Sequence, residues 1–78
     1  MYTVYTKDNC SYCEMAKALL QQNGLPFQAI KLGEGISRDE LLVKIPTART
    51  MPQILKDDVL IGGYTELART LTLDAQRG

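Results

Sequence analysis

The only two cysteines of the 78-residue chain are separated by two residues, in the segment Cys10-Ser11-Tyr12-Cys13. Two thiols at this spacing can form and break a disulfide, which is the chemistry of thiol–disulfide exchange. A structural disulfide is the alternative, but so short a loop restrains little of the unfolded chain. A zinc site is disfavoured because structural zinc needs four ligands and the chain contains no histidine. The pair therefore predicts a redox-active dithiol.

The composition argues against several other classes of function. The absence of histidine removes the Ser-His-Asp and Cys-His pairs of hydrolases. Nine Lys and Arg balance nine Asp and Glu, so the basic surplus that nucleic-acid binding needs is missing. No apolar run approaches the ~20 residues of a membrane span. No signal peptide is visible at the start of the chain, so we expect a cytoplasmic protein without membrane association.

The elements that position the cysteines follow from the spacing of apolar residues. Residues 2–6 are β-branched or aromatic throughout, which predicts a first strand. Apolar residues then recur at helical spacing from Tyr12 until Gly24 and Pro26 end the helix. Cys10 is therefore expected where the first strand gives way to the first helix.

The rest of the chain predicts a strand, a short helix, a hairpin and a final helix. Ser37 and Glu40 have the spacing of a capping box, and Thr65 is expected to cap the last helix. The expected elements are a strand at 27–32, a helix from 37 to 45, strands at 53–56 and 59–61, and a last helix that begins at 65, carries Leu67, Ala68 and Leu71 on its apolar face and frays over 74–78.

The resulting order, β-α-β-α-β-β-α, predicts one α/β sandwich over residues 1–78. A right-handed crossover makes the first two strands parallel, and the later hairpin adds antiparallel strands. We therefore expect a mixed four-stranded sheet flanked by three helices, because a chain of this length has room for a single domain.

This placement assigns different roles to the two cysteines. The N-terminus of a helix carries about half a positive charge and unpaired N–H groups, which favour a thiolate. Cys10 lies at or just before the first turn and is predicted to attack, while Cys13, one turn further in, resolves. Lys7 either adds positive field or is a solvated turn residue. Tyr12 is expected at the rim of the site.

Three separated motifs resemble those of the glutaredoxins, and they extend over nearly the whole chain. The motifs are Cys10-Ser11-Tyr12-Cys13, Thr50-Met51-Pro52 and Gly62-Gly63-Tyr64-Thr65-Glu66. The resemblance implies a thioredoxin-like fold and a glutathione-dependent disulfide oxidoreductase. It also implies a cis peptide bond before Pro52, which would turn the Met51 backbone toward the ligand.

The resemblance further implies where glutathione lies. Its cysteine would pair with the Met51 main chain, and its γ-glutamyl end would meet the start of the last helix at Gly63 and the two residues after it. Lys7 and Arg49 are candidates for the glycine carboxylate. The family often has Asp where Thr65 or Glu66 stands, so either residue could contact the γ-glutamyl amine. The candidate glutathione-binding residues are Lys7, Tyr12, Arg49, Thr50, Met51, Pro52, Gly63, Tyr64, Thr65 and Glu66.

The resemblance implies glutathione as the reductant of a monomer without bound cofactor or metal. Disulfide-containing or glutathionylated proteins would be the substrates. The short chain and its Thr-Met-Pro motif are similar to phage or bacterial glutaredoxins, for which ribonucleotide reductase is a usual electron acceptor. Two alternatives stay open: a redoxin that takes electrons from thioredoxin reductase, and a dimer in which Cys10 and two glutathiones bridge an iron–sulfur cluster. Ser11, where Pro is commoner, keeps the second alternative open.

Overall fold

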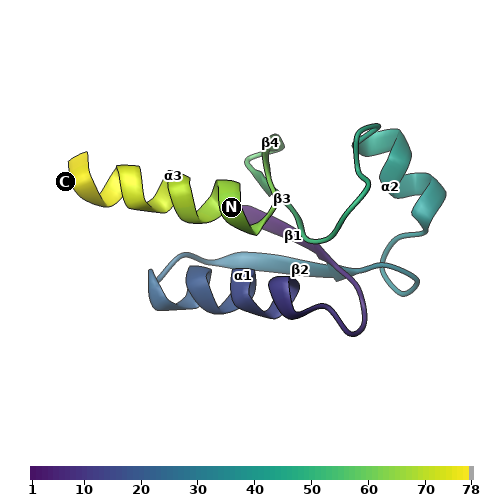
Figure 1. Cartoon of the computed structure of the whole chain (residues 1–78). Helices are drawn as coiled ribbons and strands as arrows, with labels where there is room; N and C mark the ends of the chain where they lie inside the picture. Colours follow the sequence, from purple (N-terminus) through teal and green to yellow (C-terminus); the bar gives the residue numbers. More distant parts are fainter. Residues whose placement is uncertain (78) are drawn as a thin grey trace.

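Seven elements build one mixed sheet and three helices in a computed structural model that describes residues 1–77, with side chains through residue 73. The elements are β1 (Tyr2–Thr6), α1 (Ser11–Gln22), β2 (Phe27–Lys31), α2 (Arg38–Lys44), β3 (Gln53–Lys56), β4 (Val59–Gly62) and α3 (Tyr64–Arg77). The strand order is β2-β1-β3-β4, with β1 parallel to β2 and antiparallel to β3 (Figure 1). The predicted α/β sandwich and its element order are confirmed.

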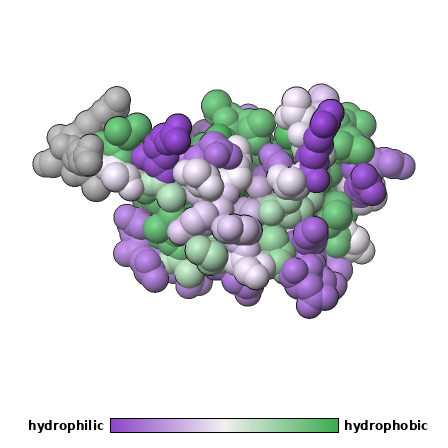
Figure 2. Space-filling view, viewed as in Figure 1, coloured by the Kyte–Doolittle hydropathy of each residue, from purple (hydrophilic) through white to green (hydrophobic). Residues whose placement is uncertain are grey.

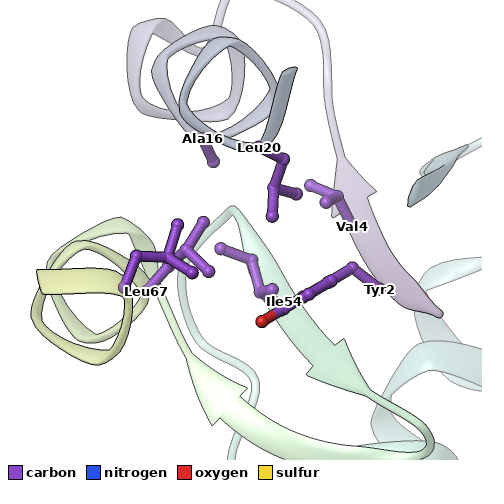
Figure 3. Close-up of a cluster of buried hydrophobic side chains, with 7 residues drawn as sticks. Tyr2, Val4, Ala16, Leu20, Ile54 and Leu67 are labelled. Atoms are coloured by element: carbon purple, nitrogen blue, oxygen red, sulfur yellow. The ribbon is translucent and has the colours of Figure 1, made fainter. Parts of the chain in front are cut away.

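Helices cover the two faces of the sheet unequally. α1 and α3 pack together on one face, and α2 lies apart from them in Figure 1. Because side chains alternate along a strand, Val4 faces α1 and α3 while Tyr5 faces α2. Figure 3 shows side chains from α1, α3, β1 and β3 converging on the larger core. That core contains Tyr2, Val4, Ala16, Leu20, Ile54, Leu67 and Leu71, and the smaller one contains Tyr5, Ile36, Leu41 and Ile45.

The burial of α1 fixes the position of the cysteine pair. Cys13, Ala16 and Leu20 are spaced by three and four residues and form its buried face. Cys10 is the N-cap residue, with extended backbone dihedrals. The anchored helix therefore holds its N-terminus, and the cysteines with it, at the end of β1.

The starts of the other two helices are capped differently from each other. At α2 the predicted capping box is present: Ser37 Oγ accepts from the Glu40 N–H at 3.1 Å, and the Ser37 N–H donates to Glu40 Oε1 at 3.2 Å. At α3 the expectation that Thr65 is the cap is wrong. The helix begins at Tyr64, so Thr65 lies inside its first turn. The helix also continues to Arg77, into the segment 74–78 that was expected to fray.

Some large apolar side chains remain on the surface. Val59 and Leu60 on β4 and Val43 on α2 are exposed. Figure 2 shows apolar side chains gathered over these two elements, with hydrophilic ones around them. Within the described residues, no helix combines the length and the apolar character that crossing a bilayer requires.

Candidate active site

The cysteine pair lies at the N-terminus of α1 and is held as a Cys10–Cys13 disulfide, with the two Cα atoms 5.2 Å apart. The side chain of Cys10 is partly exposed, whereas Cys13 is only 1% exposed. A second disulfide can therefore reach only the sulfur of Cys10. This difference suits Cys10 to attack and Cys13 to resolve, and that division of roles stays a prediction.

The helix start directs a hydrogen-bond donor at the accessible sulfur. The Cys13 N–H donates to Cys10 Sγ at 3.1 Å, and the Glu14 N–H donates to the Cys10 carbonyl oxygen at 3.3 Å. A negative charge on Cys10 Sγ is stabilised at this place by the N–H group and by the positive end of the helix dipole. The local structure thus favours the thiolate that thiol–disulfide exchange needs.

The strand pairing brings the second motif beside the first. β1 and β3 are antiparallel with Tyr5 opposite Gln53, so the end of β1 lies next to the loop that precedes β3. In this loop the Met51–Pro52 peptide bond is cis, as the resemblance implies. Cys10 Sγ lies 3.7 Å from the Met51 carbonyl oxygen. A molecule disulfide-bonded to Cys10 would therefore begin next to the Met51 main chain.

Gln53 holds this loop, although no sequence motif marks it as a site residue. Its side chain is 8% exposed, and its Nε2 donates to the Thr50 carbonyl oxygen at 2.7 Å. A buried amide must find a partner, and here the partner closes the turn over residues 50–53. The sequence does contain one sign of this role, because Gln53 is a polar residue directly after Pro52, at the start of a strand expected to be buried.

The third motif completes a cleft. β3 and β4 are paired with Ile54 opposite Gly62, which places the start of α3 beside the loop of Met51. The rings of Tyr12 and Tyr64 lie 5.9 Å apart across the two helix starts. Tyr12 is 59% exposed, at the rim as expected. A cleft of about 280 Å³ is lined by Tyr12, Thr50, Met51, Pro52, Gly63, Tyr64, Thr65 and Glu66.

One carboxylate in this cleft folds back onto the turn that precedes its own helix. Glu66 Oε1 accepts from the Gly63 N–H at 2.8 Å. The absence of a side chain at Gly62, where φ is 127°, permits this contact, since a Cβ there would lie 2.8 Å from the Glu66 Cγ and Oε1. Gly63 lines the cleft, but its N–H is engaged within the chain. The donors that α3 presents are thus the N–H groups of its first turn, which precede the first intrahelical bond, from Leu67 to Gly63.

Two of the expected glutathione-binding residues lie outside this cleft. Lys7 and Arg49 line a neighbouring hollow of about 190 Å³ that shares Thr50 and Met51 with the cleft. Arg38 from α2 joins them there, although its sequence pattern marked it only as part of a helix start. Met51 therefore separates a cleft at the start of α3 from a hollow with three cationic side chains.

A third hollow, of about 590 Å³, lies on the other side of Cys10. Four of its charged side chains are paired with one another, since Lys31 contacts Asp8 at 2.5 Å and Lys17 contacts Glu14, while the fifth, Lys7, forms no ion pair with the described side chains. The hydrogen bond to Asp8 raises the pKa of the Lys31 ammonium group. Four of the five charges are thus neutralised, and the remaining one belongs to Lys7, which also lines the hollow beside Met51. Among the described side chains, no cluster of three potential metal ligands occurs.

Comparison with known proteins agrees with this geometry. A family model described as Glutaredoxin matches residues 2–61. Glutaredoxin 3 of Escherichia coli strain K12 is 39% identical over 75 residues, covering 96% of this chain and 87% of that protein. The glutaredoxin-like protein NrdH of Lactococcus lactis subsp. cremoris is 35% identical over 71 residues, covering 88% of this chain and 97% of that protein. The crystal structure of a buckwheat glutaredoxin–glutathione complex has a TM-score of 0.76 at 26% identity, over 94% of this chain and 69% of that one.

The matches extend over most of the chain, and the fold places the Cys10–Cys13 pair where thiol–disulfide exchange requires it. The chain belongs to the glutaredoxin family of the thioredoxin superfamily, and it is a thiol–disulfide oxidoreductase.

Proposed function

We propose that glutathione is the reductant of this protein and binds in the cleft beside Met51. The observation that carries the proposal is the convergence of three sequence-distant motifs on one cleft of about 280 Å³. Cys10 Sγ lies 3.7 Å from the Met51 carbonyl oxygen, so a tripeptide joined to this sulfur would extend along the cleft. The buckwheat relative with this fold is a complex with glutathione.

The proposed orientation follows from the charges around the cleft. The γ-glutamyl carboxylate would accept from the free N–H groups of the first turn of α3, where the helix dipole favours an anion. Glu66 uses one carboxylate oxygen for the Gly63 N–H, and its other oxygen is proposed to accept from the γ-glutamyl ammonium group. The glycine carboxylate would face Lys7 and Arg49, on the other side of Met51.

The reaction then proceeds by four thiol–disulfide exchanges, each of which forms or breaks a disulfide bond to Cys10. The Cys10 thiolate attacks a substrate disulfide, so a mixed disulfide forms, the substrate S–S bond breaks and the leaving thiolate takes a proton from water. Cys13 attacks Cys10 Sγ, which forms the Cys10–Cys13 disulfide and releases the reduced substrate. One glutathione attacks Cys10 Sγ, and a second attacks the resulting glutathionyl sulfur. This step returns the dithiol and releases oxidised glutathione.

A direct test compares the two possible reductants. The oxidised protein is mixed with glutathione, glutathione reductase and NADPH, or with thioredoxin reductase and NADPH, and NADPH consumption is followed with a disulfide substrate. We expect turnover with glutathione. Turnover with thioredoxin reductase alone would overturn the proposal and favour the second candidate function, a thioredoxin-reductase-dependent redoxin. That candidate is supported by the 35% identity to an NrdH protein over 97% of the length of that protein.

The finer parts of the proposal concern the setting of this reaction. We propose a cytoplasmic monomer that reduces protein disulfides and glutathionylated thiols, with ribonucleotide reductase as one electron acceptor. The iron–sulfur alternative predicts visible absorption bands and a dimer in anaerobically purified protein. A colourless monomer under those conditions supports the reductase.

A further inference from the structure

The hollow beside Met51 combines three cations with an apolar floor, and we call it the cationic hollow. Its cations are the side chains of Lys7, Arg38 and Arg49. Its apolar lining is formed by Leu32, Leu41, Leu42 and Ala48. No acidic residue lines it, although the chain as a whole has no net charge. Its composition is therefore suited to an anionic group with an attached apolar group.

Acidic residues next to these cations in the sequence do not neutralise them. Asp8 follows Lys7 but is paired with Lys31. Asp39, which follows Arg38, forms no ion pair with it, and Glu40 accepts from the Ser37 N–H. Among the described side chains, Lys7, Arg38 and Arg49 take part in no ion pair. The positive charge of the hollow is thus available to a ligand.

Arg38 has no evident role in the stability of its own helix. It is the first residue of α2, where the positive end of the helix dipole disfavours a cation. Ser37 and Glu40 supply the cap without it. A charge that does not help α2 but lines a hollow beside the active site is better explained by binding.

Glutathione would fill this hollow only in part. In the orientation of the proposed function, its glycine lies toward the cationic hollow, and glycine has no side chain to cover Leu41 and Leu42. A protein substrate attacked by Cys10 would lie along the same Met51 main chain, but its polypeptide continues beyond this point. Residues that follow its cysteine would then reach the cations and the apolar floor.

We infer that the cationic hollow selects protein disulfides in which the attacked cysteine is followed by an acidic and an apolar residue. The inference rests on the proposed function only for the direction of the bound chain. The acidic side chain would pair with Arg38, and the apolar side chain would cover Leu41 and Leu42. The reaction at Cys10 would thus be faster for substrates that carry these residues after the attacked cysteine than for substrates that carry them before it.

The test uses short peptides and a single turnover of the reduced protein. Each peptide carries its cysteine as a mixed disulfide with thionitrobenzoate, and the coloured thiolate is released when the protein becomes oxidised. The peptides are acetyl-Gly-Cys-Glu-Leu-amide, acetyl-Gly-Cys-Lys-Leu-amide and the reversed acetyl-Leu-Glu-Cys-Gly-amide. The rate of the protein with each peptide is divided by the rate of dithiothreitol with the same peptide. This ratio corrects for differences in the intrinsic reactivity of the peptides. No glutathione is present, so the result is independent of whether glutathione is the reductant.

We expect the Glu-Leu peptide to react about threefold to fivefold faster than the Lys-Leu peptide, at the upper end of what an exposed ion pair gives. Raising the salt concentration to about 0.5 M should reduce this ratio toward one. The variant Arg38→Gln should lower the ratio below about twofold, while Arg38→Lys retains most of it. Lys44→Gln, which removes a cation from the last turn of the same helix, is the matched control and should leave the ratio unchanged.

Three outcomes would overturn the inference. One is a ratio near one in the unmodified protein, and another is a ratio that Arg38→Gln leaves intact. The third is an equal rate for the reversed peptide, because a general positive field would not distinguish the order of residues. The unfolding midpoint of each variant is measured as well, and we expect a small increase for Arg38→Gln and a small decrease for Lys44→Gln, because the helix dipole disfavours a cation at the first position and favours one in the last turn. A variant that still unfolds cooperatively shows that a lost preference does not reflect a lost fold.

Discussion

Replacing Glu66 separates its observed role, capping α3, from its proposed role, binding the γ-glutamyl ammonium group. Glu66 Oε1 accepts from the Gly63 N–H at 2.8 Å, which is the cap, and the other carboxylate oxygen is proposed to bind the ligand. The variant Glu66→Gln keeps an oxygen for the Gly63 N–H but removes the negative charge. The variant Glu66→Ala removes the hydrogen bond as well.

The expected stability changes follow from these two losses. Losing the charge near the N-terminus of α3 costs about 0.3–1 kcal/mol of unfolding free energy. Losing the hydrogen bond to the Gly63 N–H costs about 0.5–1.5 kcal/mol more. For a domain of this size, each kcal/mol lowers Tm by about 4–8 °C. Thermal unfolding should therefore show a small decrease in Tm for Glu66→Gln and a clearly larger one for Glu66→Ala.

The KM for glutathione should change by a similar factor in both variants, unlike the Tm. A hydrogen bond to a charged partner contributes about 1 kcal/mol more binding free energy than one between neutral groups. This value is taken from the low end of the range because the Glu66 carboxylate is exposed. This difference corresponds to about a fivefold change in affinity. Both variants should raise the KM for glutathione by about fivefold or more, measured with glutathione reductase on protein shown to be folded.

The variant Glu66→Gln therefore tests whether Glu66 contacts the γ-glutamyl ammonium group. An unchanged KM in this variant would show that Glu66 does not contact the ammonium group and serves only as a cap. A lower KM would show that its charge repels the γ-glutamyl carboxylate, which contradicts the proposed orientation. In each case, the rate of alkylation of Cys10 should stay unchanged, since that thiolate is stabilised at a different helix.

Other predictions test the dithiol, the turn before α3 and the core. Cys10→Ser should abolish all activity, while Cys13→Ser should retain deglutathionylation and lose most protein-disulfide reduction; equal losses in a glutathionylated-peptide assay would contradict the assigned roles. Gly62→Ala should lower stability and raise the KM for glutathione, because its methyl group would meet the carboxylate that caps α3. Gly24→Ala, at a positive φ in open space, should cost about 1–2 kcal/mol in strain without changing that KM. Ile54→Ala, at a fully buried site, should cost about 2–5 kcal/mol in urea unfolding, and a smaller loss would contradict its place in the core.

Local sequence patterns determined the elements and the position of the cysteines. The β-branched and aromatic run of β1, the apolar spacing of α1 and the capping box at Ser37 act over a few residues, so they can be recognised without the fold. The same patterns placed Cys10 at the junction of β1 and α1. The start of α3 was misplaced because its cap is formed by a backbone N–H and the side chain of Glu66, not by the hydroxyl of Thr65.

The shape of the site was decided by contacts between distant segments. The pairing of Tyr5 with Gln53 and of Ile54 with Gly62 brings the loop of Met51 between the starts of α1 and α3, which resemblance implied but no local pattern specified. The packing of Leu41 against the opposite face of the sheet brings Arg38 to the same loop. Local propensity acts through neighbours in sequence, whereas a cleft arises from strand register and helix packing, so only the tertiary structure could show that Met51 lies between the start of α3 and a cationic hollow.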